Sequence, residues 1–320
     1  MPVYLTAALA SFIISAAGLI ALIPVLRSIK FGQYVRAEGP ASHLAKTGTP
    51  TMGGVVFLLS IPGAMLLAGS RGVMDYAAVS LIVALGILGL LDDYLKIRRR
   101  NSDGLSKKQK IAGQVIVSTA FSVALWRFSG SVIWLPLPGR LYDIGLFIIP
   151  AAAFVIIATA NGVNFADGLD GLCSGVTFIV AVAFLLLCRA WGLSEISWLA
   201  GALAGTCIGF LCFNIHPAKV FMGDTGAFAL GGAVAALALR TGTAVLLPLL
   251  GIVYVAEVGS VILQVRYFRM TGGKRLFRMT PIHHHFELGG WSEVKTDVVF
   301  WLVTVIAAAM YLWILLSMGY

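Results

Sequence analysis

Long apolar stretches recur along nearly the whole chain and are separated by short polar segments. A helix that crosses the hydrocarbon core of a bilayer needs about 20 predominantly apolar residues. The pattern predicts ten membrane-spanning helices, at residues 3–25, 52–69, 76–95, 110–126, 144–163, 172–190, 196–213, 225–240, 243–266 and 296–318. The polar segments leave no room for a separate soluble domain, so we expect one all-α membrane domain over residues 1–320.

Composition supports a membrane protein and narrows its partners. Hydrophobic residues make up 59% of the chain and charged residues only 12%, against about 25% charged in soluble domains. The net charge of +9 does not indicate nucleic acid binding, because no basic stripe is interleaved with stacking aromatics. It fits anionic lipid headgroups or a polyphosphate substrate. In the Gly- and Ala-rich stretch 196–240, small residues are also typical of close helix packing.

The distribution of positive charge predicts the membrane orientation. Ten spans leave both termini on one face, and five basic residues fall on that face: Arg71, Arg127, Arg140, Arg189 and Arg240. The other 18 of the 23 lysines and arginines fall on the opposite face. Because cytoplasmic loops carry the excess of positive charge, we predict external termini. On the external face, the stretch 129–142, with Trp134 and two prolines, predicts a hairpin or an interfacial turn.

The same topology gathers acidic residues and all five histidines on the cytoplasmic face. Asp92 and Asp93 end the apolar run 81–91, and adjacent carboxylates raise each other's proton affinity unless a cation neutralises them. A divalent ion would do so. The alternative is a pair of helix-end carboxylates matched to Lys96 and Arg98.

Two further segments combine carboxylates with glycines. The segment 161–171 contains Asn164, Asp167 and Asp170 in an oxygen-rich turn suited to magnesium or sugar hydroxyls, although it lacks the EF-hand pattern; a structural Asx-turn is the alternative. The segment 214–226 contains Asp224, which could bind magnesium together with substrate phosphate. For Asp224 the alternative is a helix N-cap.

Histidines and lysines supply the remaining candidates. The run from His283 to His285 disfavours zinc, since consecutive side chains point in different directions. Hydrogen bonding to phosphate or sugar is preferred, with a solvated loop as the alternative. Lys46 and Lys110 are candidate phosphate-binding charges, although attraction to the lipid surface would also explain basic loops. The chain contains no Walker loop after a strand, so ATP hydrolysis has no support.

From about Ser42 to Lys295 the chain resembles the polyprenyl-phosphate N-acetylhexosamine-1-phosphate transferase superfamily, and within it the phospho-N-acetylmuramoyl-pentapeptide transferase family. The resemblance is carried by Leu91-Asp-Asp93, Asn164-Phe-Ala-Asp-Gly-Leu-Asp170-Gly-Leu172 and Pro281-Ile-His-His-His285-Phe-Glu287. It implies a magnesium-dependent transfer of phospho-MurNAc-pentapeptide from UDP-MurNAc-pentapeptide to undecaprenyl phosphate. The products would be lipid I, for peptidoglycan synthesis, and UMP. The resemblance further implies ten helices, a homodimer, and an active site on the cytoplasmic side of the bacterial cytoplasmic membrane.

The resemblance also implies residue roles. It gives catalytic roles to Asp92, Asp93, Asp224 and His283, with Asp224 as the main magnesium ligand. Substrate contacts are implied for Lys46, Thr51, Lys96, Lys110, Asn164, Asp167, Asp170, Asn214, Phe221, Gly223, His284 and His285. Asp92 is either a base or a group that positions the lipid phosphate. We prefer a one-step displacement, while a path through a phospho-aspartate stays open.

Two other functions compete with this one. A sister enzyme that transfers GlcNAc-1-phosphate to the same lipid would share the aspartate framework and the reaction. The histidine run and the segment 48–54 favour the muramoyl substrate. A secondary transporter would place ionisable groups near the bilayer midplane, whereas here the acids lie toward one face. Glu257, within the predicted ninth span, is the exception and receives no functional assignment.

Overall fold

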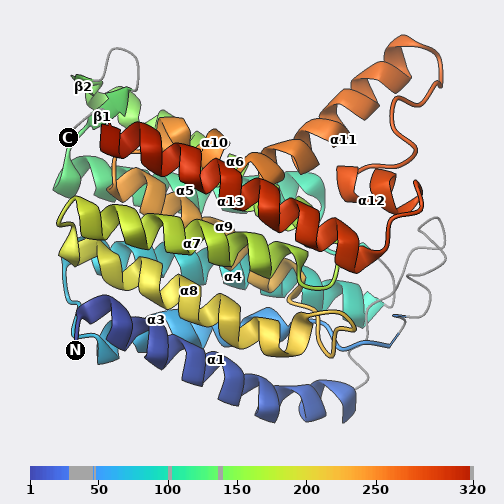
Figure 1. Cartoon of the computed structure of the whole chain (residues 1–320), viewed down its shortest axis with the longest axis horizontal. Coiled ribbons are helices and arrows are strands. Elements are labelled where there is room, and N and C mark those ends of the chain that lie inside the picture. The colour runs from blue at the N-terminus through green and yellow to red at the C-terminus, as the bar shows by residue number, and fades with distance from the viewer. Residues whose placement is uncertain (29–45, 47, 100–102, 136–139, 318–320) are drawn as a thin grey trace.

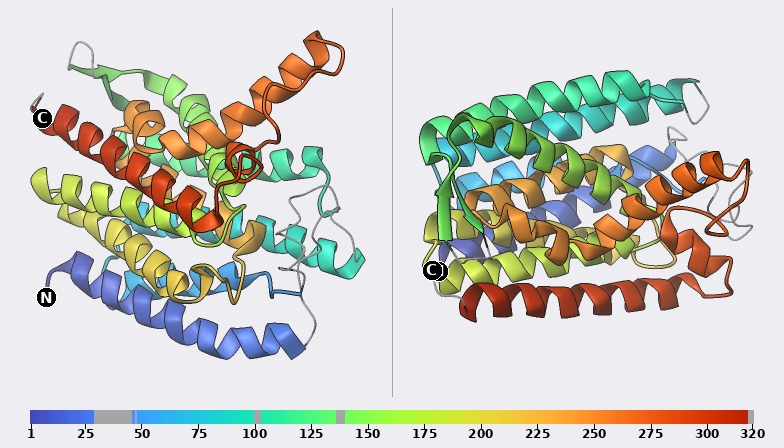
Figure 2. Two further views of the ribbon diagram at one scale, coloured as in Figure 1. Left: turned by 45° about the vertical axis from the view of Figure 1, so that its right-hand side comes forward. Right: turned by 90° about the horizontal axis from the view of Figure 1, so that it is seen from above.

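The computed structural model describes residues 1–28, 46, 48–99, 103–135 and 140–317. Its long helices run side by side along one axis (Figures 1 and 2). The main helices are α1 (Val3–Ser28), α3 (Phe57–Leu67), α4 (Val73–Arg99), α5 (Lys107–Ser129), α6 (Ile148–Ala166), α7 (Leu172–Ala190), α8 (Ser194–Asn214), α9 (Gly223–Arg240), α11 (Ile252–Met270) and α13 (Glu293–Ser317). Shorter helical elements are α10 (Leu247–Leu250), α12 (Ile282–Glu287) and 3₁₀ turns at Gly53–Val56, Gly145–Phe147 and Ala244–Leu246.

Each of the ten predicted ranges contains a helix, which confirms an all-α membrane fold at the level of elements. Among the described residues, seven helices are long and apolar enough to cross a membrane. The number rises to eight if the bent pair Ala244–Leu250 and Ile252–Met270 forms one span. The helical stretch Gly53–Ala68 is apolar but shorter. The count of ten spans therefore stays a prediction.

Helix α9 explains why length and hydropathy alone do not identify every helix of the bundle. Every residue from 225 to 238 is buried, because α9 packs between other helices rather than against lipid. A helix surrounded by protein needs small side chains for close approach more than large apolar ones. The Gly- and Ala-rich composition of this segment thus reflects close helix packing, which was one interpretation of the stretch 196–240 from its sequence.

Helix α8 shows the same principle against α1. Gly201, Gly205 and Gly209 recur every four residues, so they form a stripe on one face of α8. A Cβ atom on Gly205 would lie 2.0 Å from the carbonyl oxygen of Ala8. The two backbones can touch only because this stripe has no side chains.

The predicted turn at 129–142 is confirmed as a hairpin. Strands β1 (Val132–Leu135) and β2 (Arg140–Asp143) pair antiparallel, with Val132 opposite Asp143. The hairpin contacts the segment that follows α9, where the backbone N–H of Trp134 donates to the carbonyl of Gly242. This end of the bundle also holds the start of α1 and the end of α13 (Figure 1), and we refer to it as the hairpin end.

The predicted span 243–266 is bent rather than continuous. Helices α10 and α11 meet at an angle of 82° at Gly251. Pro248 lies in the first turn of α10, and Gly251 leaves the helical conformation, so the hydrogen-bonded ladder breaks there. Helix α11 consequently leans out of the bundle and carries α12 away from the hairpin end (Figure 1).

Candidate active site

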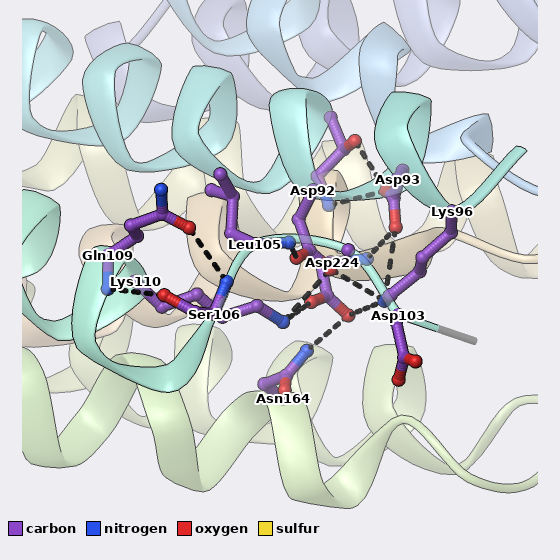
Figure 3. Close-up of polar contacts among 12 residues, drawn as sticks. Asp92, Asp93, Lys96, Asp103, Leu105, Ser106, Gln109, Lys110, Asn164 and Asp224 are labelled. Carbon is purple, nitrogen blue, oxygen red and sulfur yellow. Dashed lines mark hydrogen bonds and ion pairs between the residues drawn. The ribbon is translucent and has the colours of Figure 1, made fainter. Parts of the chain in front are cut away.

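Three carboxylates from two helices meet at the end of the bundle opposite the hairpin. Asp92 and Asp93 lie near the end of α4, and Asp224 lies at the start of α9. One carboxylate oxygen from each lies within 4.8 Å of the other two. The three aspartates, which the sequence placed on one face of the membrane, therefore lie together in the structure (Figure 3). We refer to this end of the bundle as the aspartate end.

The carboxylate of Asp93 caps helix α9 from outside. It accepts hydrogen bonds from the backbone N–H groups of Asp224 and Thr225, at 3.1 and 3.0 Å, and from the Thr225 hydroxyl at 2.7 Å. An anion at a helix N-terminus is stabilised by the helix dipole and by the unpaired N–H groups. Asp224 itself makes no capping bond to α9. The alternative that made Asp224 the N-cap was therefore wrong: Asp224 lies inside the first turn of α9, and the N–H groups there are satisfied by Asp93.

Two lysines reach across the other carboxylates. Lys96 Nζ lies 2.7 Å from Asp92 Oδ2 and 3.3 Å from Asp224 Oδ1, and Lys110 Nζ lies 2.9 and 2.7 Å from Asp92 Oδ2 and Asp224 Oδ2. The Asn164 amide donates to Asp224 Oδ1 at 3.0 Å. Because Lys96 also approaches Asp93 at 3.7 Å, two positive charges face three negative ones.

The loop that follows α4 holds Asp92 in place. The backbone N–H of Leu105 donates to Asp92 Oδ1 at 2.6 Å. A Cβ atom on Gly104 would lie 2.1 Å from that same oxygen, so the loop can approach only because residue 104 is glycine. The loop then enters α5 through a capping box between Ser106 and Gln109, which fixes the turn from which Lys110 projects.

This arrangement fits a divalent cation. Carboxylate oxygens are the ligands that Mg²⁺ prefers, usually one or two of them together with substrate phosphates. Asp93 is occupied by three donors from α9, so Asp92 and Asp224 are the better placed ligands. Both are contacted mainly by lysine ammonium groups, which a substrate phosphate can attract away.

Thr51, Phe221 and Gly223 lie in two paired segments beside this cluster. The backbone N–H of Phe221 donates to Pro50, and those of Gly53 and Gly54 donate to Phe221 and Met222. Gly223 has a φ of +70°, and a Cβ atom there would lie 2.5 Å from Asp93 Oδ2 and 3.2 Å from Thr51 Oγ1. Gly223 is thus required by conformation and by contact with Asp93.

A second charged cluster surrounds Lys46. Its ammonium group donates to Asp170 Oδ1 at 2.7 Å and to Glu293. His216 Nδ1 lies 3.1 Å from Asp170 Oδ2 and 2.7 Å from Glu293 Oε2. Burial lowers the pKa of Lys46, but the two carboxylates outweigh this and raise it above the usual value. Phe221 faces the same ammonium group, with its ring centre 6.0 Å away.

The loop between α6 and α7 links the two clusters. Burial, together with Asp224 and Asp93, raises the pKa of Asp167 to about 8. Asn214 is buried and braces the loop: its amide oxygen accepts from the Gly171 N–H and the Ser174 hydroxyl, both at 3.1 Å. The Asp170 carboxylate accepts from Lys46 and from the Ala218 N–H, not from its own turn. The simple Asx-turn alternative therefore does not describe Asp170.

The three consecutive histidines have three different surroundings, as their adjacency predicted. His283 Nδ1 lies 3.0 Å from the Glu257 carboxylate, and His284 Nδ1 lies 2.8 Å from that of Glu287. His285 Nδ1 accepts from the backbone N–H of Arg278. Of the three, only His283 is fully buried.

Three residues that contact the predicted site residues were not predicted from the sequence. They are His216, Glu257 and Glu293. Glu293 opens helix α13, where an acidic residue is already favoured by the helix dipole. Its position therefore carried no separate signal of a site. His216 lay inside a segment that had been singled out for Asp224, and its partners come from residues 170 and 293.

Comparison with known proteins matches the chain to one family. Residues 76–242 match the family described as Glycosyl transferase family 4, and residues 46–58 match the phospho-N-acetylmuramoyl-pentapeptide-transferase signature 1. The phospho-N-acetylmuramoyl-pentapeptide-transferase of Heliobacterium modesticaldum is 48% identical over 97% of each chain. Those of Moorella thermoacetica and Clostridioides difficile are 48% and 46% identical, over 91% and 95% of this chain and 92% and 94% of their own lengths.

The chain belongs to the phospho-N-acetylmuramoyl-pentapeptide-transferase family. The signature covers Lys46 and Thr51, and the wider match covers the aspartate cluster and the loop from Asp167 to Asp170. The histidine run lies beyond both matched ranges, but the similarity to relatives of this family covers almost the full length of the chain. In the structure, Lys46 donates to Asp170 in the loop after α6, and Asn164 near the end of α6 donates to Asp224, so this one segment contacts both clusters.

Proposed function

We propose that this membrane enzyme transfers phospho-MurNAc-pentapeptide from UDP-MurNAc-pentapeptide to undecaprenyl phosphate, forming lipid I and UMP in peptidoglycan synthesis. The observation that carries the proposal is the cluster of Asp92, Asp93 and Asp224 with Lys96 and Lys110, at one end of a membrane bundle whose relatives bear that enzyme's name. Carboxylates for a metal and lysines for phosphate are what a reaction between two phosphorylated substrates needs.

The chemistry is a displacement at phosphorus. An oxygen of the lipid phosphate forms a bond to the β-phosphorus of the nucleotide sugar, and the bond from that phosphorus to the bridging oxygen breaks, so UMP leaves with the electron pair. The lipid phosphate is already anionic at neutral pH, so a strong base is not required. We assign Asp92, held by Leu105 and flanked by both lysines, to positioning the attacking phosphate.

Among this chain's own residues, the lysines are assigned to neutralising the charge of the phosphates. Lys96 and Lys110 face the carboxylates now and would turn to the pyrophosphate oxygens, where they neutralise charge as the bond breaks. Asp92 and Asp224 would hold Mg²⁺, which supplies further neutralisation of phosphate charge. We assign Asp224 as the main ligand because its carboxylate is contacted by the Asn164 amide and by two lysine ammonium groups, whereas the Asp93 carboxylate is engaged by the N–H groups of α9.

We assign the nucleotide portion to the second cluster. Lys46, Asp170 and Phe221 combine a cation, a carboxylate and an aromatic face, which suits a base and its ribose. Asp167 joins this region to the aspartate cluster. His284 and His285 lie on α12, next to His283, whose ring packs against Gly168 of this loop, and are assigned to the sugar or its phosphate.

The proposal includes ten spans, external termini, a cytoplasmic active site in the bacterial plasma membrane, and a homodimer. The orientation is supported by the concentration of basic residues at the aspartate end, where α4 finishes with Lys96, Arg98 and Arg99 and α5 begins with Lys107, whereas the homodimer rests on the family resemblance alone. The start of α1 and the end of α13 share the opposite end (Figure 1). Lys30, Arg36 and Arg100, which contributed to the charge count, lie outside the described residues.

The decisive experiment reconstitutes the purified chain with undecaprenyl phosphate and Mg²⁺ and measures UMP release. We expect release from UDP-MurNAc-pentapeptide, none from UDP-GlcNAc, and loss of release on chelation. Release from UDP-GlcNAc alone would keep the chemistry and overturn the substrate. No release from either substrate, by protein that unfolds cooperatively on heating, would overturn the transferase proposal.

A further inference from the structure

A buried carboxylate lies inside helix α11 and, within the described residues, is hydrogen-bonded to one side chain. Glu257 is 0% exposed, and its Oε2 atom lies 3.0 Å from Nδ1 of His283 on α12. Its other oxygen has no hydrogen-bond partner within the described residues. A charged group inside a membrane helix is costly and is seldom retained without a use. The functional proposal above leaves Glu257 without one.

The contact with Glu257 sets the chemical state of His283. An ionised carboxylate can only accept a hydrogen bond, so the proton of the neutral ring must be on Nδ1. The Nε2 atom is then left as an acceptor. Carboxylates commonly orient functional histidines in this way, by fixing both the tautomer and the ring plane.

The free side of the ring faces the loop between α6 and α7. A Cβ atom on Gly168 would lie 2.2 Å from His283 Nε2, so the ring packs directly against the backbone at that residue. The Nε2 atom is buried and has no hydrogen-bond partner among the described residues. Gly168 separates Asp167 from the segment that ends in Asp170, and both aspartates are assigned to substrate binding.

We propose that Glu257 is a positioning residue of the active site, which acts through His283 on the loop from Asp167 to Gly171. The inference rests on the proposed function for the identity of the substrate. The chain of contacts runs from α11 through α12 to the loop, and in the described part of the chain no hydrogen bond or ion pair joins Glu257 to the aspartate cluster. The 82° bend before α11 is what allows a residue of this helix to meet the histidine run.

The test replaces Glu257 by leucine, which removes the acceptor, and by glutamine, which keeps an acceptor oxygen. Glu257→Leu should raise the KM for the nucleotide sugar about 10-fold or more, by analogy with the loss of other orienting carboxylates. The KM for the lipid phosphate should not change, and Glu257→Gln should recover most of the loss. A purely structural role would lower the amount of active enzyme and leave both KM values unaltered, which would overturn the proposal.

A double-mutant cycle shows whether Glu257 works through the histidine. In a His283→Phe background, Glu257→Leu should change the KM for the nucleotide sugar less than about twofold, since coupled residues are not additive. An equal effect in both backgrounds would overturn the assignment. If the Glu257 variants fail to fold, Gly168→Ala serves instead, because its added methyl group must displace the His283 ring. It should raise the same KM, and an unchanged KM would contradict the proposal.

A readout that does not need turnover separates this inference from the proposed function. In protein labelled with ¹⁵N-histidine, the His283 signal, assigned by its loss in His283→Phe, should show a proton on Nδ1. That signature should disappear in Glu257→Leu and persist in Asp75→Asn, which alters a buried carboxylate at the other end of the bundle. One outcome is that the wild type releases no UMP while the Nδ1 proton of His283 is still present in it and lost in Glu257→Leu. In that case the functional proposal fails and the positioning of His283 by Glu257 stands. An unchanged tautomer in Glu257→Leu would overturn the inference.

Discussion

Two buried ionic networks lie at opposite ends of the same helix pair, α4 and α9. At the hairpin end, Asp75 Oδ1 accepts from Arg240 at 2.9 Å and from the Trp198 indole at 2.8 Å. One carboxylate meets one cation there, and the side chains of Asp75 and Arg240 are only 7% and 8% exposed. At the aspartate end, three carboxylates meet two lysines that are 30% and 25% exposed.

The comparison shows what distinguishes a structural network from a functional one when the residue types are alike. A balanced, closed pair satisfies its own charges, and its removal leaves a buried charge uncompensated. The aspartate cluster keeps an excess of negative charge and lysines that solvent can reach, so further cations and phosphates have a reason to bind.

The largest effect is expected for Asp224→Asn. Removing this charge takes away the main proposed metal ligand while leaving the cap that Asp93 provides for α9. We expect UMP release to fall at least about 10³-fold, comparable to the loss of a major electrostatic group, with little change in thermal unfolding. A variant that keeps full, magnesium-dependent activity would contradict the role given to Asp224.

A smaller loss is expected for Lys110→Met. The methionine keeps much of the side-chain volume but cannot neutralise phosphate charge. Turnover should fall about 10²-fold. Raising Mg²⁺ to saturation should not reduce this fall. Lys108→Met, two residues away on the same helix and exposed, is the matched control and should retain activity. The reverse ranking would move the phosphate contact from Lys110 to Lys108.

Gly104→Ala should have an intermediate effect through Asp92. The added Cβ would lie 2.1 Å from Asp92 Oδ1, so the loop must withdraw and the Leu105 hydrogen bond must lengthen. We expect turnover to fall about 10-fold, as for other misplaced reacting groups. The KM for undecaprenyl phosphate should rise more than that for the nucleotide sugar. Equal changes in both would argue against a role for Asp92 in placing the lipid phosphate.

The smallest effect on turnover is expected at the hairpin end. Asp75→Asn leaves Arg240 without its anionic partner in a buried site, which typically costs about 3–5 kcal/mol of stability. The thermal unfolding temperature in detergent should fall, while UMP release per folded molecule should change less than about twofold. A loss of turnover without a loss of stability would mean that the two ends are coupled.

How much of this was predictable differs between the elements and their contacts. The helices and the hairpin at 129–142 follow from runs of apolar residues and from turn-forming residues, which act over short distances in the chain. The break between α10 and α11 was not predicted, because Pro248 and Gly251 lie in an apolar run that, by its length, predicts a continuous helix. Helix α9 was found, but its burial on all sides depends on neighbours that hydropathy does not identify.

The candidate site divides in the same way. Asp92, Asp93 and Asp224 were predicted to share a face of the membrane, and Lys96 was considered as a partner for the first two. Their mutual contact, and the use of Asp93 rather than Asp224 as the cap of α9, required the packing of α4 against α9. Glu257 and Glu293 could not be assigned, since their partners are 26 and 247 residues away in the chain.

The sequence by itself determined that this chain is a helical membrane protein, which of its residues are candidates for binding metal and phosphate, and which family it belongs to, because these depend on composition, local periodicity and motif. Tertiary structure alone decided which carboxylates face each other, which are already occupied, and which histidine is held by Glu257. The reason is physical: a carboxylate's role depends on the charges and donors within a few ångströms of it, and packing brings these from distant parts of the chain.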